Sequence, residues 1–312
     1  MQVHRDLQQL PAFRNAVITI GTFDGVHYGH KHIIQQLKQA AQACGGESVV
    51  VTFDPHPREV LMPGDTSVRL LTTLEEKIEL LSQEQVDHLV VVPFTKAFSE
   101  LSAQAYLENF LIQRFNPHTI IIGYDHRFGH NREGGLHLLE AEQNKYGFCL
   151  IEIPQQVVDD LTVSSTKIRN SLKVGDITLA NELLGYPYFL GGTVIHGDKM
   201  GRQLGFPTAN IGLNDPRKLI PAQGVYAVKV FVGEERRELN GVLNIGTRPT
   251  FNGKELRIEV HIFDFNEDIY DQPIRVAFMA YQREDRKYDN IDALVSQIRE
   301  DAYTAREILG IA

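Results

Sequence analysis

The sequence predicts an α/β domain with a parallel sheet, followed by a smaller antiparallel β-barrel or sandwich. The chain has 312 residues, of which 43% are hydrophobic and 23% charged, so two folded domains are expected rather than one core. In the first half, short β-branched runs alternate with helical patterns. After Tyr188 such runs follow one another closely, with Gly and Pro turns between them and no helices. We place the boundary between the domains at residues 185 and 186.

Five apolar runs of the first half predict strands, at 16–20, 48–53, 88–92, 119–123 and 148–153. Helical patterns separate them, at 30–43, 72–84, 102–114 and 134–146. The strand runs are almost wholly apolar rather than alternating, which is typical of a parallel sheet covered on both faces. In a doubly wound sheet of this kind, ligands bind at the carboxyl ends of the strands.

The second half begins after "STKIRNSLKVGDITLANELLG", which predicts two short helices. The runs "FLGGTVI", "GVYAVKVFV", "ELNGVLNIG", "LRIEVHIFDF" and "PIRVAFMAY" then predict an antiparallel β-structure. A last helix is expected over 290–309. Its apolar stripe, formed by Ile291, Leu294, Val295 and Ile298, should pack against the second domain.

Composition limits the partners. The net charge is -9 and neither half is basic, which argues against a nucleic-acid surface. Cys44 and Cys149 lack the spacing of a zinc or redox motif and are expected to be buried free thiols. No signal peptide or transmembrane run is visible. We therefore expect a cytoplasmic protein, a monomer or a weak homo-oligomer, with no membrane partner.

The stretch "GTFDGVHYGH", residues 21–30, joins the first predicted strand to the helix that follows. Gly25 permits a tight turn, and Gly29 lets the backbone approach a ligand. His27 and His30 are three residues apart at the first helical turn, so they should point the same way. A helix N-terminus beside two imidazoles can hold phosphate oxygens and stabilise the charge that develops at an attacked phosphorus. The pair could also be a cap on a solvated surface. Its position after the first strand favours the phosphate site.

A second element, "VSSTKIRN" at 163–170, should complete that site. Ser164 or Ser165 is expected at the N-cap of a helix whose first turns carry Lys167 and Arg169. Hydroxyl and amide groups there can receive phosphates, and a guanidinium offers a bidentate fork. In isolation, an ordinary capped helix with solvated cations would explain the same residues.

Two loops follow predicted strands at the ligand side of the sheet. They are "FDPHP" at 53–57 and "GYDHRFGHNREG" at 123–134. Phe128 could stack on a planar ring and Asp125 could accept a hydrogen bond. Phe128 could equally cap the core, and the prolines could simply stiffen a turn.

In the second half, "HGDKMGRQLGFPTAN" at 196–210 combines three glycines and basic residues ahead of an extended segment. Neither GxGxxG nor GxxxxGK[ST] occurs in the chain, so this is neither a Rossmann nor a Walker loop. A flap over phosphates is the remaining functional interpretation. Thr208 and Asn210 should project from one side of the segment, so both oxygens could reach one Mg²⁺.

The run "LRIEVHIFDFNEDIY" at 256–270 predicts a strand on which Arg257, Glu259 and His261 share a face. A carboxylate at a barrel mouth could take the proton from a hydroxyl that attacks a γ-phosphate. Spacing alone does not make Glu259 catalytic, because most glutamates on strands are solvated.

The opening stretch resembles the HxGH signature of the nucleotidyltransferases. "GTFDGVHYGH", "VSSTKIR", "GRQLGFPTAN", "NIGTRPTF" and "EVHIFDF" follow one another in the order seen in the bacterial bifunctional riboflavin kinase and FAD synthetase family. The resemblance covers essentially the whole chain. It implies a Rossmann-like FMN adenylyltransferase domain over 1–185 and a six-stranded flavokinase barrel with a terminal helix over 186–312. The implied reactions turn riboflavin into FMN with ATP, and then FMN into FAD with release of pyrophosphate.

The resemblance also implies roles for individual residues. His27 and His30 would stabilise the α-phosphate, Glu259 would be the general base, and Thr208 with Asn210 would hold Mg²⁺. The implied ATP and phosphate contacts are Gly21, Phe23, Asp24, Gly29, Ser164, Ser165, Thr166, Arg169, Gly201, Arg202, Gly205 and Pro207. The implied flavin contacts are Asp54, Asp125, Phe128, Gly129 and Arg283.

Two positions depart from the family pattern. His126 stands where Phe is expected, which puts flavin stacking by that residue in doubt, and Asp271 stands where Gly often follows "DIY". Two other functions stay open at this point. One is a nucleotidyltransferase for a different phosphate, such as nicotinamide mononucleotide or phosphopantetheine, and the other is a non-catalytic flavin sensor.

Overall fold

The computed structural model describes residues 1–64, 69–124, 126–154, 163–197, 200–250 and 253–311. The chain forms two compact units, Met1–Ser165 and Thr166–Ala312. Each has the architecture that the sequence predicts, a parallel α/β sheet in the first and a closed antiparallel barrel in the second.

The first unit is built on a six-stranded sheet in the order β1-β4-β3-β2-β5-β6, and every pairing is parallel. All five predicted strands are confirmed. The three-residue β1 was not predicted, because a strand this short leaves no periodic pattern. The strands are β1 (Gln2–His4), β2 (Val17–Ile20), β3 (Ser48–Asp54), β4 (His88–Pro93), β5 (Thr119–Gly123) and β6 (Cys149–Ile153).

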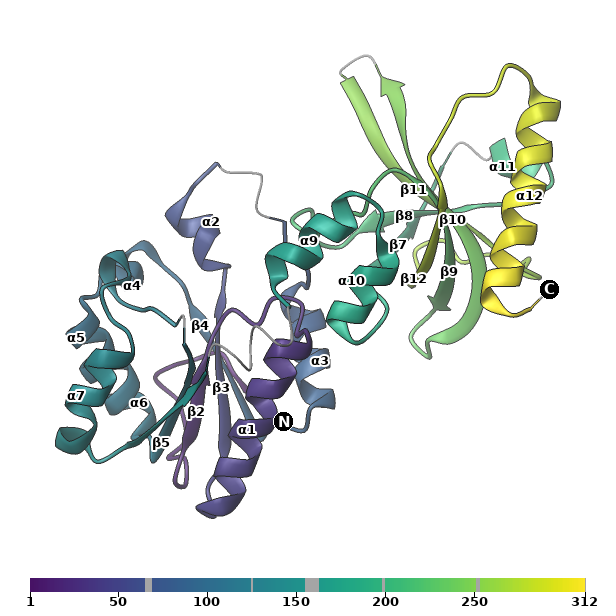
Figure 1. Ribbon diagram of the computed structural model, residues 1–312. Helices are drawn as coiled ribbons and strands as arrows, with labels where there is room; N and C mark the ends of the chain where they lie inside the picture. The colour runs from purple at the N-terminus through teal and green to yellow at the C-terminus, as the bar shows by residue number, and fades with distance from the viewer. Residues whose placement is uncertain (65–68, 125, 155–162, 198–199, 251–252, 312) are drawn as a thin grey trace. The chain divides into compact units, whose positions relative to one another are not determined.

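Helices cover both faces of this sheet, with α1 and α3 on one side and α5, α6 and α7 on the other (Figure 1). The four predicted helices are confirmed, although the third is divided into α5, the π-helix η1 and α6. Their bounds are α1 (Tyr28–Ala43), α3 (Leu74–Gln83), α5 (Ala103–Ala105), η1 (Tyr106–Ile112), α6 (Gln113–Phe115) and α7 (Leu136–Tyr146). Shorter turns are α2 (Pro57–Leu61), α4 (Lys96–Ser99) and the 3-10 turn η2 (His130–Arg132).

Successive side chains of the central strands point to opposite faces of the sheet. Ile18 and Ile20 join a buried cluster with Leu107 and Phe110 of η1, while Val17 is fully buried outside that cluster. The edge strand β6 departs from the predicted two-sided burial, since most of its residues are exposed or only partly buried. Cys149 on β6 is exposed and Cys44 is partly buried, so the expectation of two buried thiols was wrong.

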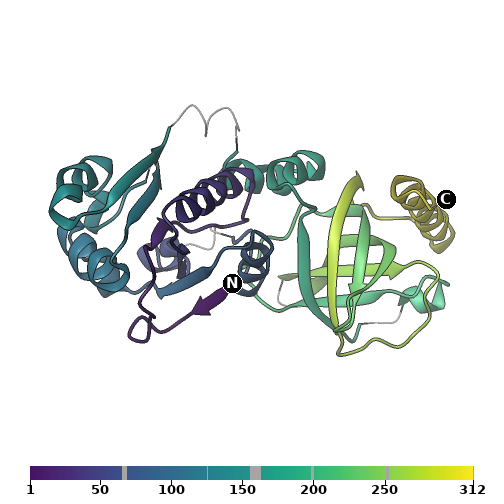
Figure 2. The same cartoon turned by 90° about the horizontal axis from the view of Figure 1, so that it is seen from below.

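The second unit contains a closed barrel in the order β10-β11-β8-β7-β12-β9, with antiparallel pairing throughout (Figure 2). All five predicted runs lie in strands, and the extended segment of Asn210 provides the sixth. The strands are β7 (Phe189–Ile195), β8 (Ala209–Leu213), β9 (Gly224–Val232), β10 (Arg237–Thr250), β11 (Gly253–Ile262) and β12 (Pro273–Arg283).

Helices α9 (Ser165–Lys173) and α10 (Ile177–Leu184) confirm the predicted helix pair. They pack on the barrel, because Asn181 donates from its amide to the Phe278 carbonyl at 2.8 Å and Ala222 donates from its backbone to Leu172 at 2.9 Å. The compact second unit therefore includes both helices, although the boundary predicted from the sequence lies after them.

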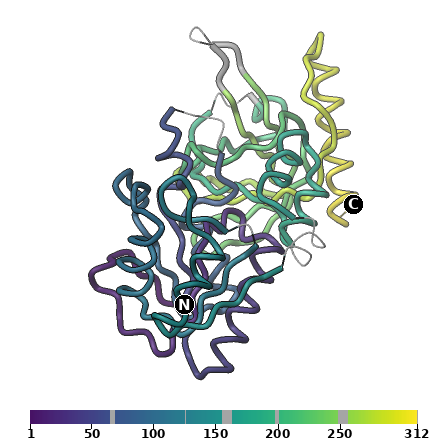
Figure 3. Tube along the Cα trace, turned by 60° about the vertical axis from the view of Figure 1, so that its left-hand side comes forward, coloured from purple at the N-terminus to yellow at the C-terminus, as the bar shows by residue number. Residues whose placement is uncertain are grey.

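The terminal helix α12 (Ile291–Leu309) lies along the outside of the barrel, and its course can be followed in Figure 3. The short α11 (Met200–Gln203) precedes β8. The predicted apolar stripe on α12 is only partly correct. Leu294, Val295 and Ile298 are half-buried, whereas Ile291 in the first turn is 65% exposed. Asp301 and Ala305 are the buried residues of α12. Among the described residues, no helix is long and apolar enough to cross a membrane.

Candidate functional sites

The signature turn between β2 and α1 holds His27 and His30 side by side. His27 is the N-cap of α1, and its Nδ1 accepts a hydrogen bond from the His30 backbone at 3.4 Å. The two imidazoles stack with ring centroids 3.7 Å apart. A Cβ added at Gly29 would lie 3.3 Å from the His27 ring, so glycine leaves room for that ring. The predicted common orientation of the two histidines is therefore seen.

His30 lies beside an aromatic ring and near positively charged side chains. The ring of Phe23 lies 5.0 Å from the imidazole, and His30 Nδ1 is buried with no hydrogen-bond partner among the described residues. Burial, and then the charges of His27 and Lys77, hold the pKa of His30 well below its ordinary 6.5. The histidine is therefore neutral at physiological pH. Its unpaired ring nitrogen is available to a ligand.

The buried Asp24 carboxylate stabilises the backbone around this site. It accepts hydrogen bonds from the backbone of Leu71 and of Thr72, each at 3.0 Å. The Asp24 carbonyl also accepts a hydrogen bond from the Ser165 hydroxyl at 3.0 Å. Ser165 is the first residue of α9 and the last residue of the first unit. Ser164 immediately precedes α9, and Thr166 and Arg169 lie in the part of α9 that belongs to the second unit.

A buried cation near the signature turn was missed by the sequence analysis. Lys77 on α3 is only 6% exposed, and its ammonium donates to the Thr52 hydroxyl at 3.3 Å. A usable signal was present, because Lys77 interrupts the apolar stripe that continues in Leu80 and Leu81 of the same helix.

The expected flavin loop is packed into the first unit. The Phe128 ring is 6% exposed and stacks on Tyr106 at 4.9 Å. Gly129 lies against the Ala103 backbone. Asp54, at the end of β3, is partly buried, and Asp125 lies outside the described residues. Flavin binding by these residues stays a prediction.

In the second unit, Glu259 is flanked by two asparagines on neighbouring strands. It pairs with Asn210 of β8 on one side and with Asn244 of β10 on the other. Directly opposite residues of antiparallel strands project on the same face within about 5 Å of each other at Cβ. The Glu259 side chain is 32% exposed and therefore open to a substrate. Asn244 was not predicted, and its Oδ1 is buried without a partner among the described residues.

The other residues predicted for this face have supporting contacts. Arg257 lies 4.0 Å from the Glu259 carboxylate, and the His261 ring donates from Nδ1 to the Pro207 carbonyl at 2.8 Å. This hydrogen bond holds the segment that contains Thr208 against β11. The predicted sharing of one strand face by Arg257, Glu259 and His261 agrees with these contacts.

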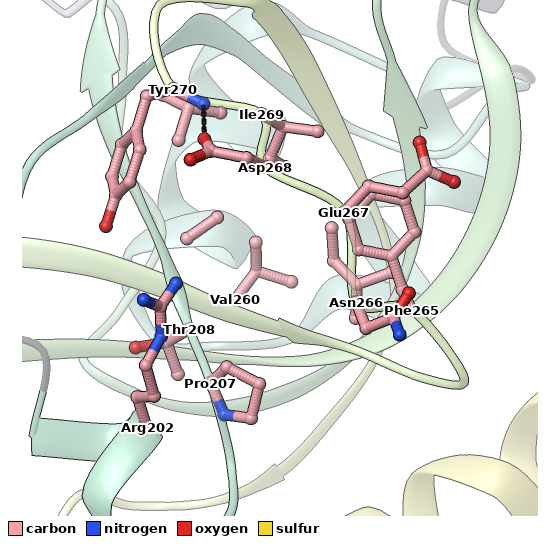
Figure 4. A pocket seen from close by; sticks show the side chains of 13 residues that line it. Arg202, Pro207, Thr208, Val260, Phe265, Asn266, Glu267, Asp268, Ile269 and Tyr270 are labelled. Atoms are coloured by element: carbon pink, nitrogen blue, oxygen red, sulfur yellow. Dashed lines mark hydrogen bonds between the residues drawn. The ribbon is translucent and has the colours of Figure 1, made fainter.

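A cavity of about 380 Å³ opens beside this segment. Arg202, Pro207 and Thr208 lie together on one side of it, and Phe265 and Tyr270 lie further round (Figure 4). Two residues predicted to contact ATP, Arg202 and Pro207, therefore share one cavity with Thr208, which was predicted to hold Mg²⁺. Asn210 and Glu259 do not line it.

The glycine-rich segment before β8 folds back over Thr208. The Phe206 backbone donates to the Gly201 carbonyl at 2.8 Å, and the Gly205 backbone donates to Arg202 at 3.3 Å. A Cβ at Gly201 would lie 2.3 Å from the Phe206 carbonyl and 3.3 Å from Thr208 Oγ1. Only glycine permits this close approach.

Arg283 has a structural partner. Its guanidinium donates to both carboxylate oxygens of the buried Asp301, at 2.7 and 2.5 Å, and to the Glu284 carbonyl at 2.8 Å. This ion pair raises the pKa of Arg283 further and joins the end of β12 to α12. A direct contact with flavin stays a prediction.

The donors near the cavity suit Mg²⁺. Thr208 and Asn210 offer neutral oxygens, which a hard cation that retains water and binds phosphate can use. No group of three His, Cys, Asp or Glu side chains gathers to hold a metal within the described ranges. A metal at Thr208 and Asn210 would therefore depend on phosphate oxygens for much of its coordination.

Two family models match the chain in succession. The model for FAD synthetase matches residues 10–167, and the model for riboflavin kinase matches residues 184–309. The two matches correspond to the α/β sheet and to the barrel.

Curated relatives resemble the chain along nearly its full length. It is 39% identical to the bifunctional riboflavin kinase/FMN adenylyltransferase of Haemophilus influenzae, over 98% of each chain. The proteins of the same description from Escherichia coli K12 and Bacillus subtilis are 38% and 40% identical, over 98% and 93% of this chain and 96% and 91% of theirs. A solved structure described as a macrolide-efflux protein from Streptococcus pneumoniae is 32% identical over 98% of each chain, with a TM-score of 0.87.

Proposed function

The chain belongs to the bifunctional riboflavin kinase/FMN adenylyltransferase family, and we propose which of its residues perform the two reactions. The chain phosphorylates riboflavin to FMN and then adenylylates FMN to FAD. The observation that carries the residue assignment is the placement of two separate groups, Glu259 between Asn210 and Asn244 in the barrel and the stacked pair of His27 and His30 in the sheet unit.

In the kinase reaction, Glu259 is the general base. Its carboxylate takes the proton of the riboflavin 5′-hydroxyl while that oxygen attacks the γ-phosphorus of ATP. The new O–P bond forms as the bond between the β- and γ-phosphates breaks, and ADP leaves. Asn244 Oδ1, buried beside Glu259, accepts a hydrogen bond from a substrate hydroxyl.

ATP for this step occupies the cavity lined by Arg202, Pro207 and Thr208. Its volume lies in the range of small-molecule sites. Phe265 and Tyr270 supply rings for the base, and Arg202 supplies charge for the phosphates. Thr208 and Asn210 would hold Mg²⁺, which would screen the charge of the phosphates.

In the adenylyl transfer, the FMN phosphate attacks the α-phosphorus of a second ATP. The bond to the β-phosphate breaks and pyrophosphate leaves. His27 and His30 donate to the oxygens on the α-phosphorus, and the N-terminus of α1 adds the positive end of its dipole. Ser164, Ser165, Thr166 and Arg169 bind the phosphates that leave.

Further proposals follow from the sequence. The functional division lies between residues 185 and 186, so that the α9 motif serves the adenylyl transfer.

The protein works in the cytoplasm as a monomer or weak homo-oligomer, and nucleic acid is not a partner.

One time course tests the order of the reactions. The full chain is incubated with riboflavin, ATP and Mg²⁺, and FMN, FAD, ADP and pyrophosphate are resolved. ADP and FMN should rise first, followed by FAD and pyrophosphate in equal amounts. FAD formation from riboflavin without a matching rise of ADP would contradict this order. Removal of Mg²⁺ with a chelator should abolish both riboflavin phosphorylation and adenylyl transfer.

A further inference from the structure

Lys77 is the one buried lysine or arginine among the described residues of the first unit. Its ammonium has three donor hydrogens, yet it makes a single hydrogen bond to described residues, to Thr52 Oγ1 at 3.3 Å. Burying an ammonium without full pairing is costly, because the charge loses hydrogen bonds to water that the protein does not replace. A residue kept at such a cost is a candidate for a role in function.

The charges around Lys77 belong to the proposed adenylyl site. Burial lowers the pKa of Lys77, and the nearby carboxylates of Asp24 and Asp54 oppose that shift. In the other direction, the charge of Lys77 helps to lower the pKa of His30. The ammonium is therefore close enough to the signature histidine to act on it electrostatically.

A short hydrogen-bond chain joins Lys77 to the signature turn. Lys77 donates to the Thr52 hydroxyl, and that hydroxyl donates to the Thr22 carbonyl at 3.1 Å. Thr52 is fully buried. Thr22 begins a turn in which Phe23 and Val26 have φ of +47° and +36°. For a bulky or β-branched residue this conformation is strained and persists only where its surroundings hold it.

We propose that Lys77 is a positioning residue for adenylyl transfer: through Thr52 it holds the strained turn that presents His27 and His30, and it supplies a buried positive charge that acts on His30. The charge favours the phosphate dianion that reacts there. This inference rests on the proposed assignment of His27 and His30.

The test compares variants of the full chain in FAD formation from supplied FMN. Lys77→Met should lower kcat roughly 10- to 100-fold, with the KM for FMN changed less than about 3-fold. The lost interaction stabilises the transition state rather than the binding of FMN. Lys38→Met is the matched control, since Lys38 donates to the Glu84 carbonyl at 2.8 Å near the opposite end of α1. It should keep the parent kcat. Riboflavin phosphorylation, which occurs in the other unit, should be unchanged in both variants.

Two further measurements separate positioning from simple loss of structure. In Lys77→Met, an NMR titration of the imidazoles should show a raised pKa for His30, with no such change in Lys38→Met. Thr52→Val should reduce kcat by roughly 3- to 10-fold, while Thr52→Ser, which keeps the hydroxyl, should restore it. The Thr52 pair decides the question if Lys77→Met does not fold.

The outcomes separate this inference from the function on which it rests. Loss of FAD formation in His30→Gln together with parent kcat in Lys77→Met overturns the role of Lys77 and leaves the site assignment standing. Parent activity in His30→Gln overturns both. Equal activity of Thr52→Val and Thr52→Ser overturns the hydrogen-bond chain.

Discussion

Glu259 and His30 have contrasting environments that match different chemical tasks. Glu259 lies on a barrel strand with its side chain about one-third exposed, so that a base there can meet a hydroxyl and return its proton to water. His30 is held neutral by burial and by neighbouring positive charge. A neutral imidazole keeps one N–H, so His30 can donate one hydrogen bond to a phosphate oxygen.

Replacement of Glu259 by Gln removes the base and keeps the shape. We expect FMN formation from riboflavin to fall roughly 100- to 10,000-fold, as is typical for loss of a general base. Adenylylation of supplied FMN should stay near the parent rate. Glu238→Gln, on the exposed side of β10, is the control and should not change either rate. Parent FMN formation in Glu259→Gln would show that another group takes the proton.

Replacement of His30 by Ala should have the reverse effect. FAD formation from FMN should fall by roughly 100-fold or more, because a donor to the charged transition state is removed. The kinase rate should persist. His137→Ala serves as control, since that side chain is 98% exposed on α7. Retained FAD formation in His30→Ala would remove the signature turn from the mechanism.

The lowered pKa of His30 also predicts a pH dependence of stability. The unfolded chain takes up a proton near 6.5, whereas the native histidine does so only at a much lower pH. The unfolded state therefore binds more protons between these values, and the free energy of unfolding falls as the pH drops below about 6.5. His30→Gln should weaken this decline. Hydrogen exchange of the α1 amides between about pH 5 and 7.5 measures it, and equal slopes in the two proteins would contradict it.

At the scale of elements, the ion pair between Arg283 and Asp301 joins the last strand of the barrel to α12. Asp301 is 6% exposed, although most of α12 faces solvent or is half-buried. The helix therefore depends on a polar contact as well as on its apolar residues, which explains why the predicted apolar stripe is incomplete.

Arg283→Met should loosen α12 because it leaves Asp301 buried without its charge partner. We expect a loss of about 2–4 kcal/mol in the free energy of unfolding of the second unit. Urea denaturation and proteolysis within α12 measure the change. Arg237→Met is the control, because its partner Glu267 is 58% exposed and such pairs contribute less than about 1 kcal/mol. Equal stability of the two variants would contradict the role given to Asp301.

At the scale of the whole molecule, structural and functional divisions of the chain need not coincide. Helices α9 and α10 pack on the barrel, yet the motif that begins α9 reaches the Asp24 carbonyl through Ser165. Ser165 is the last residue of the first unit, whereas the rest of α9 belongs to the second unit.

Fragments of the chain test this division. A fragment of residues 166–312 should unfold at a higher temperature than one of residues 186–312, since the shorter fragment lacks the contacts of Leu172 and Asn181 with the barrel. The missing hydrogen bonds and the uncovered apolar surface predict a difference of several degrees, at roughly 2–4 °C per kcal/mol for domains approaching 150 residues. Calorimetry measures it. Identical transitions would show that the helices add no stability to the barrel.

The sequence by itself determined the fold class, the predicted strands and the position of the signature turn. Apolar runs and the spacing of Gly and His are local patterns, and each reports a local conformation directly. It also placed Glu259 and Asn210 on extended segments.

Only the tertiary structure decided the partners of these residues. Asp24 accepts hydrogen bonds from a backbone segment 47 residues away, Asn244 stands beside Glu259, and Arg283 pairs with α12. Lys77 is buried because α3 covers the sheet near the end of β3. The physical reason is that periodicity encodes which face of an element is buried, whereas the group that meets that face depends on how distant segments pack.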